Sequence, residues 1–161
     1  MGLKANYKLA KEQKDFLLKL VPFSRFIQDQ TKEKTDFFNI YSPLGLKASI
    51  FLGYSIIQTN WGAHEITLYN NLLLLEKDER WKGKVIELED KVYKKFSNWH
   101  EFCSYYTDLL IFQCEFREAF AQDTFEGQLK AFIPASKLPS DYYEKIYQLV
   151  LDYNLDEFDL Y

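Results

Sequence analysis

Apolar residues recur at helical spacing near the start of the chain. Over residues 5–20 this period predicts a first helix, and Pro22 is expected to end it because proline lacks the amide hydrogen that a helix interior needs. A second, short helix is expected over 23–32. The stretch 33–42 is polar and irregular, which predicts a loop. The apolar positions that define the first helix are Leu9, Phe16, Leu17 and Leu20.

A more strongly apolar helix is expected over residues 43–59. Ser42 and Pro43 match an N-cap followed by a first helical residue. The stripe of side chains along this segment is largely apolar, which is typical of a helix packed into the body of a domain. Gln58 falls in its last turn, beside the N-W-G that ends the helix.

The clearest β signal lies in residues 85–96, which predict two short strands around Glu89 and Asp90. Directly afterwards, Asn98 and Glu101 form a capping-box pattern that begins a long helix, expected to reach the region of Ala121.

Two more helices are expected towards the end of the chain, one over 124–133 and one from Asp141 to near Asn154. With one hairpin among several helices, the pattern predicts a mainly α fold of the α+β kind. The length fits one domain over residues 1–161.

Charge and hydropathy narrow the possible partners. The formal net charge is −4 and basic residues are interspersed with acidic ones, so neither nucleic acid nor an anionic membrane surface is expected as a partner. No apolar run reaches the roughly 18 residues of a membrane span, and the opening segment lacks the apolar centre of a signal peptide. Aromatic residues make up 18% of the chain, so a few of them are available to line a ligand groove while most fill the core.

Metal and thiol chemistry find little support in the sequence. His64 and His100 lack a third ligand at a useful spacing, so no metal and no cofactor are expected. Cys103 and Cys114 lie eleven residues apart in what the pattern predicts as one helix, which is too far for a disulfide. Both thiols are therefore expected to be reduced.

The helix that ends I-Q-T-N-W-G, followed within ten residues by Asn-Asn-Leu, resembles the signature of family-73 glycoside hydrolases. These are the bacterial β-N-acetylglucosaminidases of autolysins and flagellar assembly enzymes. The family typically ends this helix L-E-S-G-W-G and continues N-N-L-F-G-I-K. Trp61 and Gly62 match that pattern, whereas Gln58 stands where the family has glutamate and Leu74 where it has glycine.

Two later segments extend the resemblance. Residues 93–110 resemble the family's F-R-x-Y-x-S-W-x-E-S-x-x-D-Y-x-x-L-L, although Phe96 replaces a tyrosine and Tyr105 an aspartate. Residues 140–159 resemble its closing segment. The resemblance is strongest over 43–159.

This resemblance implies a lysozyme-like fold, with a helical α-lobe and a small β-hairpin lobe over a cleft. It implies peptidoglycan, or another glycan that contains N-acetylglucosamine, as the ligand. It also implies the cell envelope or the extracellular space as the location, which the chain itself leaves open because no signal peptide is visible.

The difference at position 58 bears on the chemistry. Cleaving a glycosidic bond needs a carboxylic acid that protonates the leaving oxygen, and the resemblance assigns that role to this position. Gln58 has no proton to deliver near neutral pH, and loss of a general acid typically costs on the order of 10² to 10⁴ in rate. The first hypothesis is therefore a glucosaminidase-fold protein that has lost hydrolysis and binds a glycan or a protein partner.

Two alternatives stay open. An active β-N-acetylglucosaminidase with a displaced acid would use Glu65 or Glu87, although an exposed surface carboxylate is the simpler interpretation of each. A deliberate Glu-to-Gln knockout of a working enzyme is the other, but Leu74 and Phe96 also depart from the family pattern.

Four residues are candidates for glycan binding, because sugar rings pack on aromatic side chains while amides bind hydroxyl groups. Core packing is the alternative for the aromatic residues, and Asn71 is equally suited to anchor its own loop. The candidates are Trp61, Asn71, Phe96 and Tyr106.

Overall fold

A computed structural model describes residues 9–161, and its fold is mainly helical with one antiparallel hairpin. This confirms the predicted fold class. The helices are α1 (Lys11–Phe37), α2 (Ala48–Thr59), α3 (Trp99–Phe112), α4 (Arg117–Phe120), α5 (Phe125–Ala135) and α6 (Tyr142–Tyr153). The strands are β1 (Val85–Leu88) and β2 (Lys91–Lys94), and three short 3₁₀ helices are η1 (Glu65–Tyr69), η2 (Cys114–Phe116) and η3 (Leu155–Phe158).

Helix α1 is one continuous helix, so the prediction of two helices separated at Pro22 was wrong. Pro22 is exposed, and so is Leu18, whose carbonyl lacks an amide partner four residues on. Water can therefore solvate that carbonyl, and the buried face runs through the proline without interruption. The stretch 33–42 is also helical as far as Phe37. Residues 5–8 of the predicted first helix lie outside the described part of the chain.

Helix α2 begins at Ala48, five residues later than predicted. Ser42 does act as a local cap, but its hydroxyl accepts from the amide of Gly45, whose φ of +64° turns the chain before the helix starts. The first amides of α2 are satisfied from elsewhere in the molecule. Gln28 of α1 accepts from the amide of Ala48 at 3.2 Å, and Asp159 accepts from the next amide at 2.7 Å.

The hairpin and the helix that follows it match the prediction. Glu89 and Asp90 form the turn with φ values of 48° and 66°, and Val85 pairs with Lys94. Asn98 caps α3 by accepting from the amide of Glu101 at 2.8 Å. Helix α3 ends earlier than predicted, at Phe112, so the two cysteines do not share a helix.

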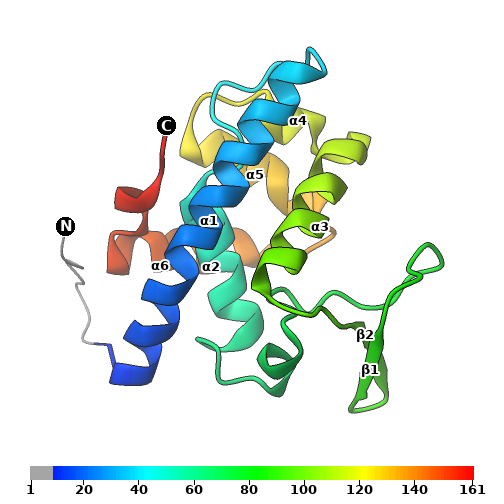
Figure 1. Ribbon diagram of the computed structural model, residues 1–161. Coiled ribbons are helices and arrows are strands. Elements are labelled where there is room, and N and C mark those ends of the chain that lie inside the picture. Colours follow the sequence, from blue (N-terminus) through cyan, green and yellow to red (C-terminus); the bar gives the residue numbers. More distant parts are fainter. Residues whose placement is uncertain (1–8) are drawn as a thin grey trace.

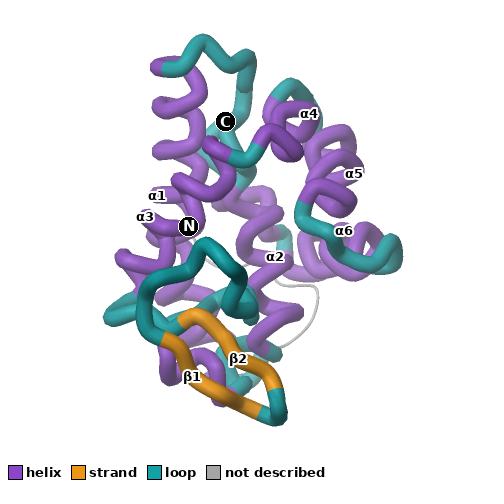
Figure 2. Tube along the Cα trace, turned by 90° about the vertical axis from the view of Figure 1, so that its right-hand side faces the viewer, coloured by secondary structure: helices purple, strands orange, loops and turns teal. Residues whose placement is uncertain are grey.

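Helix α2 forms the centre of the molecule, and every residue from Ala48 to Ile56 is buried. Helices α1 and α6 pack on it, and α1 also packs on α3 (Figure 1). The hairpin projects from the helical body at the end remote from α4 (Figures 1 and 2). None of the helices formed by residues 9–161 is long and apolar enough to cross a membrane.

Candidate functional site

Gln58 lies in the last turn of α2, where the backbone leaves the helix through two residues in the left-handed region, Asn60 and Trp61. Its partly buried side chain makes two hydrogen bonds. The amide nitrogen Nε2 donates to the carbonyl oxygen of Leu73 at 3.1 Å. The amide oxygen Oε1 accepts from the hydroxyl of Tyr142, at the start of α6, at 2.9 Å.

These two hydrogen-bond partners determine the orientation of the Gln58 amide, that is, the positions of its nitrogen and its oxygen. The carbonyl of Leu73 only accepts hydrogen bonds, so the group that faces it must be a donor, and only the NH₂ end of Gln58 supplies one. A carboxylate in the same place would set one of its oxygens against the carbonyl oxygen, which is unfavourable unless the carboxyl is protonated. The surroundings of position 58 therefore suit an amide or a protonated carboxyl, but not a carboxylate.

The loop that supplies the Leu73 carbonyl is held by Asn71, which has no exposed surface. Its Nδ2 donates to the carbonyls of Leu75 and Lys94, and its Oδ1 accepts from the amides of Leu73 and Leu75. A further clamp comes from α2, where the hydroxyl of Ser55 donates to the carbonyl of Leu72. The structure thus favours the anchoring role of Asn71 over direct contact with a glycan.

A cleft of about 460 Å³ lies between the hairpin lobe and the helices, and it begins one helical turn before Gln58, at Tyr54. On one side it is bounded by the segment that runs alongside β2, where the amide of Lys77 donates to the carbonyl of Val92. The other side is formed by α3 and by the end of α5. Polar and charged side chains in its lining include Tyr54, Glu76, Asp78, Lys94, Tyr106 and Ser136.

Two tyrosines, Tyr54 of α2 and Tyr106 of α3, line the helical side of this cleft. Burial raises the pKa of Tyr54, with a further contribution from Tyr142, and burial together with Tyr54 raises the pKa of Tyr106. The hydroxyl of Tyr106 is buried without a hydrogen-bond partner among the described residues, and so is that of Ser136. Both residues line the cleft, but their hydroxyl oxygens are closed off from solvent, and each unsatisfied buried hydroxyl costs free energy.

Lys94 is a buried cation in the same cleft, with only 3% of its side chain exposed. Its ammonium donates to Asp78 and to the hydroxyl of Tyr105, both at 2.8 Å, and lies 5.6 Å from the ring centroid of Trp81. The hydrogen bond from Lys94 is the main cause that holds the pKa of Asp78 below its ordinary value. Tyr105, which stands at a family aspartate, therefore links α3 to the hairpin lobe.

The other residues that the sequence suggests for glycan binding or acid catalysis do not gather around Gln58. Phe96 is buried in the core, its ring 5.0 Å from that of Phe102, so it presents no free face to a sugar. Trp61 is partly exposed and packs edge-on against Tyr153 at 5.1 Å. Glu65 and Glu87 are exposed and are not among the residues that line the cleft. The acidic side chains in its lining are Glu76 and Asp78.

The sequence did not point to Tyr142, Tyr54 or Lys94 as site residues. Tyr54 precedes Gln58 by four residues on the same helix, so it lies on the same face, and that spacing was an available signal. Tyr142 and Lys94 reach the site only through tertiary packing, and no local pattern marks them.

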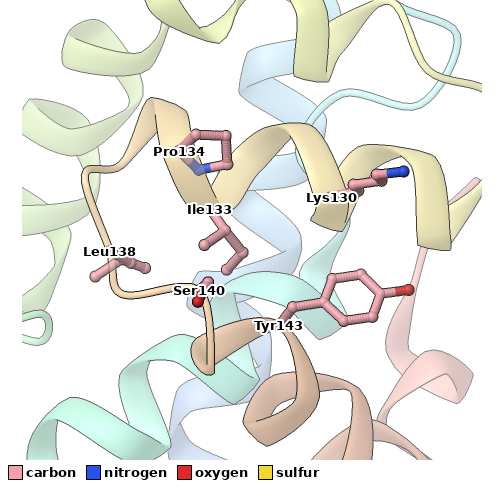
Figure 3. Close-up of a pocket in the computed structure, with 6 residues that line it drawn as sticks. All are labelled: Lys130, Ile133, Pro134, Leu138, Ser140 and Tyr143. Carbon is pink, nitrogen blue, oxygen red and sulfur yellow. The ribbon is translucent and has the colours of Figure 1, made fainter.

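A second cavity of about 530 Å³ lies apart from this cleft, at the corner between α5 and α6. Ile133, Pro134 and Leu138 form its apolar part, while Lys130, Ser140 and Tyr143 contribute polar groups (Figure 3). Tyr142 and Tyr143 are neighbours in sequence but serve different places, Tyr142 binding Gln58 and Tyr143 lining this cavity.

No protein-family model and no curated protein matches the sequence. Solved structures do match the fold. The catalytic domain of the autolysin Auto from Listeria monocytogenes aligns with a TM-score of 0.68 and 16% identity, over 95% of this chain and 90% of that one. The chain has the fold of this hydrolase domain. It is also the fold that the resemblance to family-73 glucosaminidases implies.

Two further structures share this fold. The glycoside hydrolase domain of FlgJ from Salmonella typhimurium aligns with a TM-score of 0.65 and 20% identity, over 86% of both chains. A chain from a type VI secretion system effector–immunity complex of Pseudomonas protegens aligns with a TM-score of 0.55 and 11% identity, over 91% of this chain and 98% of that one.

Proposed function

We propose that this protein binds peptidoglycan, or another glycan containing N-acetylglucosamine, in the cleft that begins at Tyr54, one helical turn before Gln58, and that it does not hydrolyse the glycan. The proposal rests on the pair of hydrogen bonds that the Gln58 amide makes. Both of its ends are engaged, the nitrogen by the Leu73 carbonyl and the oxygen by the Tyr142 hydroxyl.

The loss of hydrolysis follows from the chemistry of that amide. A leaving oxygen must receive a proton as the glycosidic bond breaks, and an amide has none to give near neutral pH. Both polar ends of the amide are also held in hydrogen bonds within the fold. The surroundings of Gln58 are thus consistent with a protein in which catalysis has been given up, and Leu74, Phe96 and Tyr105 depart from the family pattern as well.

Retention of glycan binding is supported by the cleft itself. Its wall carries the hydroxyls of Tyr106 and Ser136, which lack partners and are closed off from solvent, so a sugar pairs its hydroxyl or acetamido groups with them by displacing the side chains that cover them. A peptidoglycan hydrolase from Sphingomonas sp. A1 also has this fold, with a TM-score of 0.63, which is the basis for choosing this ligand. The same argument gives the cell envelope or the extracellular space as the proposed place of action.

Hydrolysis is tested with purified peptidoglycan sacculi and an assay for newly formed reducing ends. The unmodified protein is expected to release none above a buffer control, and any sustained release would overturn the loss of catalysis. In the Gln58→Glu variant, restored release would mean that one residue blocks the chemistry. Continued inactivity would instead mean that the cleft around position 58 has been rebuilt.

Binding is tested separately, by co-sedimentation with the same sacculi and by calorimetry with chito-oligosaccharides. Tyr106→Phe removes the unpartnered hydroxyl and is expected to weaken glycan binding by about 5-fold, the equivalent of one hydrogen bond. Tyr147→Phe is the matched control, because Tyr147 packs against Phe125 outside the cleft. Failure of the protein to bind sacculi at all would reject glycan binding.

The alternative of an active enzyme with a displaced acid rests on Glu65 and Glu87. If reducing ends are released, Glu65→Gln and Glu87→Gln identify the acid, because only the responsible variant loses activity. A protein partner is the other alternative, and one neighbour in fold comes from an effector–immunity complex. That alternative is favoured if neither hydrolysis nor glycan binding is found.

A further inference from the structure

We propose that this protein pairs with a second copy of itself through an exposed aromatic cluster formed by Phe37, Phe38 and Phe112. In this dimer the ring of Phe37 from each copy enters a depression that lies beside Phe112 in the other copy. The inference goes beyond glycan binding and does not depend on it. It adds an interaction surface outside the cleft and names the partner that fits this surface.

The aromatic cluster joins two segments that are far apart in sequence. Phe37 and Phe38 stand at the end of α1, and Phe112 is the last residue of α3, which packs beside α1 (Figure 1). The ring centroids of Phe37 and Phe38 lie 5.1 Å apart, and those of Phe38 and Phe112 lie 5.8 Å apart, both in edge-on contact. The three rings therefore hold one another in place, as the anchor residues of an interface do.

The aromatic cluster is unusually exposed for its residue type. The exposed fractions are 79% for Phe37, 46% for Phe38 and 69% for Phe112. Since an aromatic side chain offers about 150–250 Å² of surface, the cluster exposes roughly 300–500 Å². A stable interface buries about 800 Å² on each partner, so the cluster alone supplies roughly half of one. The surface around it has to supply the rest.

A depression of about 260 Å³ adjoins the cluster, because Phe112 is part of its lining. Tyr105 and Leu109 line it from the same face of α3, at the helical spacing that leads to Phe112, and Trp81 closes another side. A cavity of about 150 Å³ with apolar walls is large enough to bind benzene. The depression therefore has room for the ring of one phenylalanine.

A projecting ring and a matching depression on one surface make that surface complementary to itself. In a dimer with twofold symmetry each contact occurs twice, so Phe37 fills the depression of the partner while its own depression is filled in return. Phe38 and Phe112 lie between the two features and pack near the centre of the interface. A second copy of the chain supplies both features, which is the reason for choosing it as the partner.

The charges on this surface complement one another in the same arrangement. Glu33 lies one helical turn before Phe37 on α1, and Arg80 lines the depression. Neither side chain forms an ion pair or a hydrogen bond with any other residue between 9 and 161. Entry of Phe37 into the depression brings Glu33 of one copy towards Arg80 of the other. An anionic membrane would instead be repelled by Glu33 and by the net charge of −4.

The experiment is sedimentation equilibrium of the full chain over a series of protein concentrations. We expect a monomer–dimer equilibrium with a dissociation constant in the micromolar range, as suits an interface of modest size. Phe37→Ser and Phe112→Ser are each expected to weaken the dimer by about 10-fold or more, because each removes an aromatic anchor. Circular dichroism checks that both variants keep the fold.

Leu68→Ser is the matched control. Leu68 is 77% exposed and belongs to η1, which is linked to the start of α3 rather than to its end, since the carbonyl of Tyr69 accepts from the amide of Phe96. This variant also exchanges one exposed apolar side chain for serine. It is expected to leave the dissociation constant unchanged.

Reversal of charge tests the arrangement of the two copies. Glu33→Arg and Arg80→Glu are each expected to weaken the dimer by about 5-fold, because like charges then face each other across the interface. The double variant is expected to regain the original affinity, since the two charges have only changed places. A double variant that stays as weak as the single ones would overturn the proposed contact.

Two further outcomes overturn the inference. A protein that stays monomeric at every concentration does not use this surface for self-association, whatever else binds there. A dimer that survives both Phe37→Ser and Phe112→Ser forms through a different surface. Neither result bears on the assays with sacculi and chito-oligosaccharides, so glycan binding stands or falls separately.

Discussion

The hydroxyl of Tyr142 donates a hydrogen bond of 2.9 Å to the amide oxygen of Gln58, joining the start of α6 to the end of α2. Together with the bond to the Leu73 carbonyl, it uses both polar ends of the Gln58 side chain in structural contacts. The position that the family resemblance assigns to catalysis therefore acts here as a junction between two helices and the loop that leads to the hairpin lobe.

The Tyr142→Phe variant tests this junction. It leaves the oxygen of Gln58 without its donor, so we expect the free energy of unfolding to fall by about 1 kcal/mol, or roughly 2–4 °C in Tm. Tyr147→Phe serves as the control, since its ring packs on Phe125 and Tyr143. Equal melting temperatures for the two variants in differential scanning calorimetry would contradict the structural role of the bond.

Leu74 occupies the place of a family glycine and retains the backbone conformation that favours one, with φ of +55°. A side chain with a Cβ is strained there by about 1–2 kcal/mol. The loop therefore holds its path in spite of the substitution. Its anchors are the four hydrogen bonds of Asn71 and the contacts of Ser55 and Gln58 with Leu72 and Leu73.

A pair of variants isolates this strain. Both Leu74→Ala and Leu74→Gly lose the leucine side chain, but only the glycine removes the Cβ. We expect the Gly variant to be more stable than the Ala variant by about 1 kcal/mol, the reverse of the usual order. Urea unfolding of the two proteins measures the difference, and an Ala variant as stable as the Gly variant would show that the loop is not strained.

Much of the fold was predictable because it depends on local patterns. The hairpin turn at Glu89 and Asp90 and the Asn98 cap of α3 are set by a few neighbouring residues, and each was found where the sequence placed it. The errors came where tertiary contacts outweigh local preference. An exposed Pro22 was tolerated within α1, and α2 began at Ala48 because Gln28 and Asp159 cap it from distant parts of the chain.

The site was harder to predict than the fold. The resemblance proposes position 58, but Tyr142, which donates a hydrogen bond to Gln58, lies 84 residues away and carries no local signal. The three other candidates differ in how far they are buried and in whether their polar atoms have partners. Asn71 and Phe96 turned out to be fully or almost fully buried, whereas Tyr106 combines burial with an unpartnered hydroxyl beside the cleft. Residue type alone does not distinguish these cases.

The pair of Lys94 and Asp78 predicts a pH dependence of stability. Because Lys94 lowers the pKa of Asp78 in the fold, the stabilisation is fully present above the unfolded pKa of about 3.9 and is lost as the pH falls through the lower folded value. Solvent screens the pair, since 53% of the Asp78 side chain is exposed, so its contribution is about 1 kcal/mol or less.

The Asp78→Asn variant is therefore expected to melt below the unmodified protein at neutral pH, with a gap that stays constant down to about pH 5 and narrows below about pH 4. Asp123→Asn, at an exposed position, is the control and is expected to show no such gap. Thermal unfolding across this pH range checks the prediction. A gap that widens on acidification would assign the opposite sign to the interaction.

The two cysteines are expected to differ sharply in reactivity. Cys103 is fully buried in α3, and burial raises the pKa of its thiol to about 12, so almost no thiolate is present at neutral pH. Cys114 is exposed beyond the end of α3, and both thiols are free.

At pH 7.5 a maleimide reagent should label Cys114 rapidly, and Cys103 should react only after unfolding in guanidinium. Mass spectrometry of the Cys114→Ser variant provides the check, because that protein should take up no label while folded. Rapid labelling of the folded variant would mean that Cys103 becomes accessible through local opening of α3.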